Sequence, residues 1–593
     1  MKKKAAVILP ALLALMLVFS MVLVSCGGKG SSQQAAAKKE KVYRWVLQAD
    51  VPSLNAQFEV DSNVHDIYQL ASAGLYIGVP TSDGKLATIP NLADGEPQKM
   101  DADGYVWRIN IRKEAKWNNG DPINADTFIY SYRMLLDPLL VNRMANFLYD
   151  LFIKIENARE YYIQAQPGNP KVAWEDVGIK KVGDYTIELK LLQKSNVEYV
   201  KRHFVDRSTF PVYEPYYERG MNAERTSTTW GSTLDNFMGC GPYFYQTWNV
   251  GSEHIWVKNY DHWMKDVFKM DRIELRIVSD RNARVQMFQN GELETLILDN
   301  VTLETFKDDP RVLKFTGLSP YHIDINSVNT NQPILANPDF RKALYYVIDR
   351  KTVADFLGVA LPAGYYVNHQ AAGYDGMAYR DTPEAKAIEP ANYGYDPVLA
   401  KQYFDKALSD MRLSKVNIEL LYSEDGADYR AMAEFFEQDW PRVFGADKFT
   451  LTLKMVPDAM AWSLNKWKDV PNGFELGFND WGSSLSRVFP YAAFQYFHSG
   501  YNSRPNSYVT PAFDAAFQAC DSEEARSNPR LLVQRTVELE KQYLADVINV
   551  PIFHQYVQVI NSEKVILPST NYIPGCAFSD KFGALVGGDM IVD

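Results

Sequence analysis

The sequence has 593 residues and a formal net charge of -11, with 46% hydrophobic residues. An acidic chain argues against nucleic acid as a partner and against electrostatic attachment to anionic lipid, and its length predicts several structural domains of about 100 to 200 residues each. Only four cysteines are present, at positions 26, 240, 520 and 576, which excludes a scaffold built on disulfides and leaves no CxxC pair for zinc.

The first residues have the layout of a secretory signal peptide. A basic start, Lys2 to Lys4, precedes an apolar run from Ala5 to Val24, and the small residue Ser25 stands just before Cys26. The run is also long enough for an uncleaved membrane anchor, since a bilayer core needs about 20 residues. Residues 23–26, Leu-Val-Ser-Cys, resemble the bacterial lipoprotein box, which implies that residues 1–25 are removed and that Cys26 carries lipid. With Cys26 acylated, the other three cysteines could form at most one disulfide.

The chain after Cys26 changes composition where folding is expected to begin. Residues 27–41 are rich in Gly, Ser, Gln, Ala and Lys without an apolar period, which indicates a flexible tether in the segment 26–41. The stretch VYRWVLQAD from Val42 has strand-forming residues. No second apolar run is long enough to span a bilayer. Because the first segment is either a signal peptide or an anchor, we expect the body of the protein to lie outside the cytoplasmic membrane.

The remaining chain alternates β-rich and helical runs, as α/β proteins do. Residues 105–112 and 185–192 have the period of two that is expected of half-buried strands. Residues 124–136 have helical spacing, with Asn124 as a candidate N-cap after Pro122. Further along, residues 338–357 open like a helix, residues 530–546 are helical, and residues 547–560 return to strand.

Motifs of exported enzymes are absent from the sequence. It has no G-x-S-x-G, H-E-x-x-H, G-x-x-x-x-G-K-[ST] or G-x-G-x-x-G segment. The closest histidines, His254 and His262, lie in a stretch that alternates like a strand and turn, where a histidine is more often packed or at the surface than a ligand. We therefore expect no catalytic residue, no metal and no cofactor, although the many carboxylates keep an exported hydrolase as an alternative.

Four segments carry turn, hairpin and helix patterns in a fixed order. Residues 107–133 contain a strand, the turn Asn119-Gly120-Asp121-Pro122 and a helix that opens Asn-Ala-Asp. Residues 239–263 begin Gly-Cys-Gly-Pro-Tyr, residues 280–295 hold a helix and the turn Gly-Glu-Leu-Glu, and residues 340–351 read FRKALYYVIDRK. In this order the segments resemble the extracellular solute-binding proteins of family 5, the oligopeptide- and dipeptide-binding lipoproteins that feed ABC importers.

This resemblance implies an α/β type 2 periplasmic-binding-protein fold (cluster C), with two main lobes, a hinge and an extra inserted domain. The ligand would be buried between domains I and III, which close by hinge motion. The implied divisions are 42–85, 195–322 and 547–593 for domain I, 86–194 for domain II, and 323–546 for domain III.

The resemblance also implies that the ligand lies between residues 56–63 and residues 478–484. In peptide-binding members, the peptide backbone adds as a strand between these two segments. In peptide-binding members, an aspartate of the second segment pairs with the α-ammonium of the ligand. The aligned residue here is Ser484, whose hydroxyl cannot make that charge-assisted bond, so Asp480 or Glu59 would replace it, or the ligand lacks an amine there. An ordinary edge strand at 58–60 and a core role for Trp481 are the alternatives. The implied ligand residues are Phe58, Glu59, Val60, Tyr149, Asp480, Trp481, Gly482 and Ser484.

These patterns predict a substrate-binding lipoprotein of an ABC importer, which captures oligopeptides between two lobes and delivers them to a membrane permease. It would act as a monomer, held by lipid on a bacterial membrane in the periplasm or at the outer cell face, with permease and ATPase subunits as partners. Two alternatives stay open: the same importer role for a sugar, oligosaccharide or other solute, and an exported hydrolase of glycans or peptides.

Overall fold

A computed structural model of the protein describes residues 39–59, 62–81, 86–150, 153–358, 360–424, 427–457, 460, 461, 464, 470–483, 488–501, 509–568 and 585–592. Four residues singled out in the sequence, Cys26, Val60, Ser484 and Cys576, lie outside these ranges. Residues 41–592 belong to one unit.

The first sheet lies where folding is expected to begin. Its spatial order is β1 (Val42–Leu47), β10 (Arg272–Ile277), β9 (Glu253–Lys258) and β8 (Tyr243–Asn249). Tyr43, Trp45 and Leu47 are buried while the residues between them are half-buried, which is the period-two pattern of a strand. Strands β8 and β9 pair antiparallel, so the hairpin expected after Gly-Cys-Gly-Pro-Tyr is confirmed.

A second four-stranded sheet includes the strand that precedes the turn at residues 119–122. Its spatial order is β4 (Gln98–Lys99), β5 (Val106–Asn110), β7 (Thr186–Lys190) and β6 (Ile179–Gly183), which confirms both strands predicted here. Gly120 has a φ of 93°, which glycine adopts without a side-chain clash. Helix α2 (Ala125–Leu135) begins after Asn124, whose side chain accepts from the Thr127 N–H, while the Thr127 hydroxyl accepts from the Asn124 N–H. The predicted N-cap is therefore confirmed.

Short helices and one hairpin connect these two sheets. The hairpin consists of β2 (Tyr76–Pro80) and β3 (Leu86–Pro90), against which helix α4 lies. The helices of this part of the chain are α1 (Ser62–Ala71), α3 (Ala158–Ile163), α4 (Val197–His203) and α5 (Glu214–Arg219).

The third sheet has seven strands from the middle and the end of the chain. Its spatial order is β11, β17, β12, β16, β14 and β15, with β13 paired to β17. The strands are β11 (Thr295–Leu298), β12 (Val312–Ile325), β13 (Ala360–Pro362), β14 (Val416–Ser423), β15 (Phe449–Val456), β16 (Leu476–Asp480) and β17 (Asn549–Asn561). The strand predicted at 547–560 is thus confirmed. Near the end of the chain, β18 (Val565–Ile566) pairs with β19 (Asp589–Met590).

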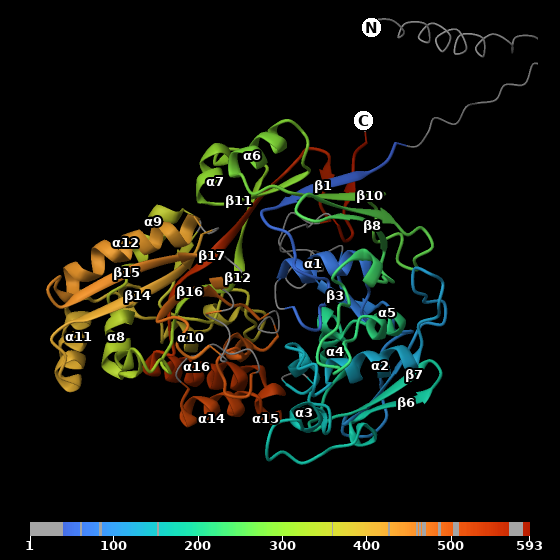
Figure 1. The fold of residues 1–593 in the computed structure, drawn as a ribbon, viewed down its shortest axis with the longest axis horizontal. Coiled ribbons are helices and arrows are strands. Elements are labelled where there is room, and N and C mark those ends of the chain that lie inside the picture. The colour runs from blue at the N-terminus through green and yellow to red at the C-terminus, as the bar shows by residue number, and fades with distance from the viewer. Residues whose placement is uncertain are drawn as a thin grey trace, which may run out of the picture. The chain divides into compact units, whose positions relative to one another are not determined.

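Strands β12 and β17 connect two lobes, as Figure 1 shows. Their pairing is regular from Val312 to Thr316, shifts in register before Pro320 and then resumes. We call residues 41–316 and 555–592 the first lobe, and residues 320–554 the second lobe. A pair of strands with an irregular register between two lobes is a suitable place for a hinge.

The helices of the second lobe follow the predicted pattern except at one break. The segment 338–357 divides into α8 (Pro338–Tyr346) and α9 (Arg350–Leu357), because the Asp349 side chain accepts from the Thr352 N–H and caps a new helix. Helix α16 (Pro529–Asp546) confirms the helix predicted at 530–546. Further helices along the chain are α6 (Arg281–Gln289), α7 (Asn300–Phe306), α10 (Pro383–Lys386), α11 (Pro397–Met411), α12 (Ala427–Phe444), α14 (Pro511–Cys520) and α15 (Glu523–Arg526).

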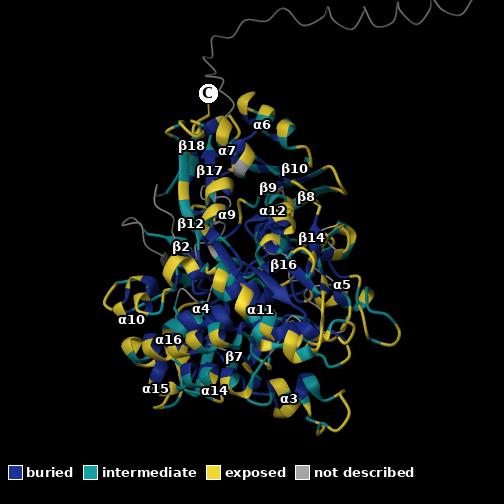
Figure 2. Cartoon of the chain, turned by 90° about the vertical axis from the view of Figure 1, so that its left-hand side faces the viewer, coloured by how far each residue is buried: buried dark blue, intermediate teal, exposed yellow. Residues whose placement is uncertain are grey.

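The large sheet is covered by apolar side chains from the helices beside it. Phe404 of α11 and Phe436 and Trp440 of α12 belong to the same buried cluster as Ile418 and Leu420 of β14. Figure 2 shows the strands around β16 as buried, with exposed residues on the outer sides of α11 and α16. One apolar face per helix is the pattern of a helix packed on a core. Leu476 and Phe478 of β16 belong to the same buried cluster, so this strand is packed inside the lobe.

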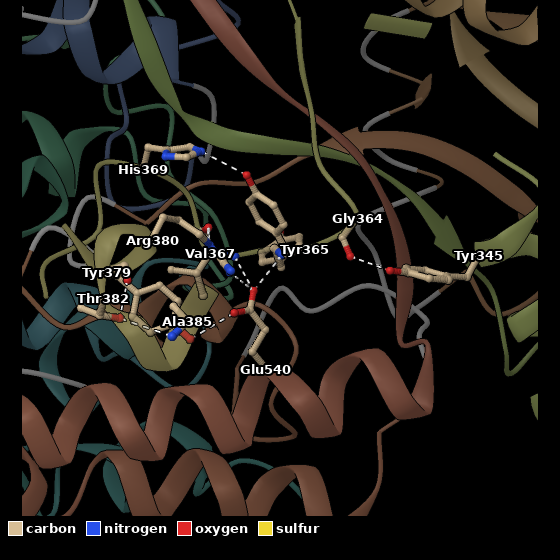
Figure 3. Close-up of polar contacts among 11 residues, drawn as sticks. Tyr345, Gly364, Tyr365, Val367, His369, Tyr379, Arg380, Thr382, Ala385 and Glu540 are labelled. Carbon is tan, nitrogen blue, oxygen red and sulfur yellow. Dashed lines mark hydrogen bonds and ion pairs between the residues drawn. The ribbon is translucent and has the colours of Figure 1, made fainter. Parts of the chain in front are cut away.

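A buried carboxylate fastens the chain around Tyr366 to helix α16. Glu540 accepts from the N–H groups of Tyr366 and Val367 at 2.9 and 3.0 Å, and from the Tyr379 hydroxyl at 3.0 Å. It also pairs with the buried Arg380 (Figure 3). A buried charge is retained when it is paired and hydrogen-bonded, so these contacts give Tyr366 a fixed place.

Candidate functional site

The second-lobe segment that is predicted to contact ligand begins where strand β16 ends. Asp480 is the last residue of β16, and Trp481 and Gly482 follow it. The Trp481 ring stacks on Tyr496, with 4.8 Å between centroids and 19° between planes, and meets Tyr501 edge-on at 5.6 Å. Trp481 is half-buried, so it packs in the second lobe while part of it stays accessible.

The Asp480 side chain lies on the other side of this strand. Successive side chains alternate across a strand, so Phe478 and Asp480 face helix α12. Tyr429 of α12 stacks on Phe478 at 5.3 Å, and its hydroxyl lies 3.4 Å from Asp480 Oδ1. The Asp480 carboxylate and the Trp481 ring therefore point to opposite sides of the chain.

The first-lobe segment is a turn at Phe58 and Glu59. The N–H groups of both residues donate to the Asn55 carbonyl oxygen, at 3.0 and 2.9 Å, and the Ser53 hydroxyl donates to Glu59 Oε1 at 3.0 Å. Phe58 is 36% exposed, and the Arg143 guanidinium lies 4.6 Å from the centre of its ring. Burial lowers the pKa of Arg143 to about 10, and the Glu59 carboxylate offsets part of this effect.

Tyr149 lies next to a contact between the two lobes. It is buried, and its ring centre is 5.9 Å from that of Tyr162. The following residue, Asp150, has its Oδ2 3.1 Å from Nε2 of His498 in the second lobe. Burial, and then the Asp150 charge, raises the pKa of Tyr501, which is the residue that meets Trp481 edge-on. Tyr149 and Trp481 thus belong to neighbouring parts of one aromatic and polar region.

The structure groups the predicted residues into two sets. Phe58 and Glu59 lie together beside Arg143. Tyr149 is instead near Trp481 in the structure, because the next residue, Asp150, acts on Tyr501, and Tyr501 contacts the Trp481 ring. Sequence patterns gave no indication of these neighbours, because they lie outside the four family segments, and the only trace of them is the density of aromatic residues at 491–501. The residues that sequence reasoning missed are Arg143, Asp150, Tyr366, Tyr496, His498 and Tyr501.

The described cysteines and two of the histidines are packed in the interior. Burial raises the pKa of the Cys240 thiol to about 12, and Cys240 and Cys520 are both buried and free. Burial lowers the pKa of His262 to about 3 and lowers that of His254, as expected for packed imidazoles. Within the same ranges, no group of three or more His, Cys, Asp or Glu side chains could hold a metal ion. None of the described helices has both the length and the apolar character needed to span a bilayer.

Two lobes joined by two long strands have the architecture of proteins that close on a ligand by hinge motion. The profile of the bacterial extracellular solute-binding proteins, family 5 Middle, matches residues 87–503. The chain belongs to this family, whose members are binding proteins.

Individual relatives resemble the protein over nearly its whole length. It is 25% identical over 606 residues to the oligopeptide-binding protein OppA of Bacillus subtilis (strain 168), covering 97% of this chain and 98% of that one. The substrate-binding domain of an oligopeptide ABC transporter from Bacillus anthracis str. Ames superposes with a TM-score of 0.78 at 20% identity, covering 94% and 99% of the two chains. Listeria monocytogenes OppA bound to peptide superposes with a TM-score of 0.75 at 21% identity, covering 93% and 100%. The predicted fold is therefore confirmed.

Proposed function

We propose that this protein is the substrate-binding component of an ABC importer and that its solute is an oligopeptide. Support comes from the family, from the relative named as oligopeptide-binding and from the homologue solved with peptide. The observation that carries the proposal is the arrangement of two lobes that meet at β12 and β17 and each bear a candidate segment. A peptide that contacts both segments favours closure, because only contacts that differ between two states shift their equilibrium.

The peptide backbone would lie as an added strand between the two segments. Phe58, Glu59 and Val60 would line it from the first lobe, and Gly482 and Ser484 from the second. Trp481 would form a wall of the site, with Tyr149 on the side of the first lobe. Backbone pairing uses groups that every peptide has, so we expect the site to accept many sequences.

We propose Glu59, rather than Asp480, as the partner of the peptide α-ammonium. The Asp480 side chain faces helix α12, away from the Trp481 ring. Glu59 belongs to the first-lobe segment itself, and the Ser53 hydroxyl holds its carboxylate. An ionised carboxylate can give the charge-assisted bond that Ser484 cannot.

The anchor, the partners and the domain division are part of the same proposal. The sequence at residues 23–26 supports a lipidated Cys26, which would hold a monomeric receptor beside its permease and ATPase, outside the cytoplasmic membrane. All strands of the second sheet lie within 86–194, which supports an inserted domain there.

Mass spectrometry of the mature N-terminus tests the anchor: a diacylated Cys26 is expected, and an unmodified chain that retains Met1 would refute it.

A mixed library separates this function from the alternatives of a sugar solute and a hydrolase, neither of which is favoured by an observation on this protein. The purified protein is incubated with peptides and oligosaccharides, and mass spectrometry follows both the retained compounds and any new products. We expect retention of intact peptides. Retention of sugars alone would exclude an oligopeptide as the solute. Turnover of any compound would exclude a function limited to binding.

A further inference from the structure

Three polar side chains lie in a row beneath the Trp481 segment, on the neighbouring strands β12 and β16. His322 and Asp324 are fully buried, and Asn479 is 3% exposed. His322 pairs with Asn479 across the strands, and Asp324 pairs with Gly477. Because Gly477 has no side chain, the amide of Asn479 can reach the Asp324 carboxylate, which is its diagonal neighbour on the same face.

Each member of this row contacts the next. Asn479 Nδ2 donates to Asp324 Oδ2 at 2.7 Å, and Asp324 Oδ1 lies 3.1 Å from His322 Nε2. The other ring nitrogen of His322, Nδ1, lies 3.1 Å from the Pro320 carbonyl oxygen. A carboxylate removed from water is retained only where hydrogen bonds or opposite charges compensate it. The Asn479 amide supplies such a hydrogen bond, so its position follows from that of Asp324.

Asn479 transmits this constraint to the ligand segment. Its Oδ1 accepts from the Asp480 N–H at 2.9 Å, at the point where strand β16 ends. Its Nδ2 also lies 3.3 Å from the Tyr496 hydroxyl, and the Tyr496 ring carries the stacked Trp481. Burial, and then the Asp324 charge, raises the pKa of Tyr496 well above its ordinary value, so the hydroxyl stays neutral in this contact.

A second buried carboxylate, Glu540, holds the backbone of Trp481 through Tyr366. The Tyr366 hydroxyl donates to the Trp481 carbonyl oxygen at 3.3 Å, and the Tyr366 N–H donates to Glu540 at 2.9 Å. Glu540 is the carboxylate whose contacts Figure 3 shows. Groups inside the second lobe thus place the Asp480 N–H, the Trp481 carbonyl and the Trp481 ring.

We propose that Asp324 and Asn479 are positioning residues for Trp481, and that they set peptide affinity from a place that peptide does not contact. This inference rests on the proposed function. A wall that is already ordered does not have to be ordered on binding, and this increases affinity without any new contact. Without the Asp324 charge the Asn479 amide loses its fixed orientation, and the Asp480 N–H and Tyr496 lose a partner.

The variants Asp324→Asn and Asn479→Ala test the proposal, with Asn326→Ala as a matched control. Asn326 is buried like Asn479 and directly follows β12, the strand of Asp324, but its Nδ2 donates to the carbonyl oxygens of Pro471 and Phe474. Asn479→Ala and Asn326→Ala remove buried hydrogen bonds, and Asp324→Asn replaces the charged acceptor of the Asn479 amide with a neutral one, so all three are expected to lower the melting temperature. Only the first two act on Trp481.

Two readouts on the full-length protein distinguish positioning from a general loss of stability. The first is hydrogen exchange of the amides at 480–483 without peptide, and the second is calorimetric affinity for a pool of synthetic tetrapeptides and pentapeptides. For the two test variants we expect about tenfold faster exchange and about tenfold weaker binding, the size of one lost buried hydrogen bond. Asn326→Ala should change affinity by less than about twofold, because its hydrogen-bond partners Pro471 and Phe474 precede strand β16, whereas Trp481 follows the other end of that strand.

Unchanged exchange at 480–483 in both test variants, or an affinity loss no larger than that of Asn326→Ala, would overturn the proposal. If the wild-type protein binds no peptide of the pool, the proposed function fails, while the exchange comparison still decides the positioning role. Should Asn479→Ala not fold, Asn479→Ser replaces it with the same expected direction.

Discussion

The two candidate ligand segments differ in how firmly the protein holds them. In the second lobe, Trp481 has a stacked partner, a hydrogen-bonded carbonyl and a buried amide behind it. In the first lobe, Phe58 and Glu59 form a short turn whose side chains contact Ser53 and Arg143 nearer the surface. If both segments line the site as proposed, the Trp481 segment would be a rigid wall and the turn at Phe58 and Glu59 an adjustable one. A receptor for varied peptides benefits from both, because one fixes the backbone and the other adapts to side chains.

Removal of the rigid wall should have the largest effect. For Trp481→Ala we expect peptide affinity to fall by about 30-fold or more, since a central aromatic contact contributes about 2 kcal/mol or more. Trp481→Phe keeps a ring on Tyr496 and should lose less. Calorimetry measures both affinities, with melting temperatures as a check on folding. Equal affinity of Trp481→Ala and the wild-type protein would show that the wall does not touch peptide.

Loss of the first-lobe charge should come next and depend on the peptide terminus. Glu59→Gln should weaken binding of a peptide with a free amine by about tenfold, because a hydrogen bond to a charged group contributes about 1.5 to 3 kcal/mol. It should leave an N-acetylated copy of that peptide unaffected. Asp480→Asn is the matched control and should not distinguish the two peptides. The opposite pattern would assign the ammonium to Asp480.

A third variant changes the distance between the two segments and leaves both intact. Lys154 of the first lobe pairs with Asp521 of the second, whose side chain is 5% exposed and also accepts from the Tyr491 hydroxyl at 2.7 Å. Lys154→Met should raise the open population and weaken binding by about fivefold, since affinity scales with the fraction of closed protein.

Small-angle scattering without peptide measures this opening. Lys190→Met is the control, because Lys190 pairs with Glu156 of the same lobe at 2.7 Å. Identical scattering from Lys154→Met and the wild-type protein would remove the ion pair from the closing mechanism.

The smallest effect should appear as a pH dependence of closure. Burial, and then the Asp299 charge of the first lobe, raises the pKa of Asp428 to about 6, while the Arg281 charge lowers it. Opening of the lobes would remove the Asp299 contribution and so lower the pKa of Asp428. The closed state would therefore hold its proton more tightly, and closure should weaken as pH rises through about 6.

Asp428→Asn should abolish this dependence, which we expect to be about threefold in affinity because a half-buried group is partly screened. Asp355→Asn, on the outside of helix α9, serves as the control. A wild-type affinity that rises over the same pH range would contradict the assignment to Asp428.

Local patterns predicted much of the fold, because strand periods, turns and caps act over a few residues. The strand at 42–47, the strands at 106–110 and 186–190 and the cap at Asn124 are examples. The break between α8 and α9 was not predicted, since the helical period continues on both sides and only the side-chain contact of Asp349 interrupts it.

The site was predictable only in part. Family resemblance indicated Trp481, but the residues that hold it come together through strand pairing. Asp324 and Asn479 are 155 positions apart and meet because β12 lies beside β16. No local period carries that information, and the same holds for Asp150 and His498, which belong to different lobes.

Titration calorimetry of the wild-type protein, with a peptide that it retains from the library, tests the proposed function most directly. We predict one peptide per protein, a saturable heat and a negative change in heat capacity, because closure around Trp481 buries apolar surface. No saturable heat with any retained peptide, together with saturable heat from an oligosaccharide, would contradict the assignment of this protein as a peptide receptor.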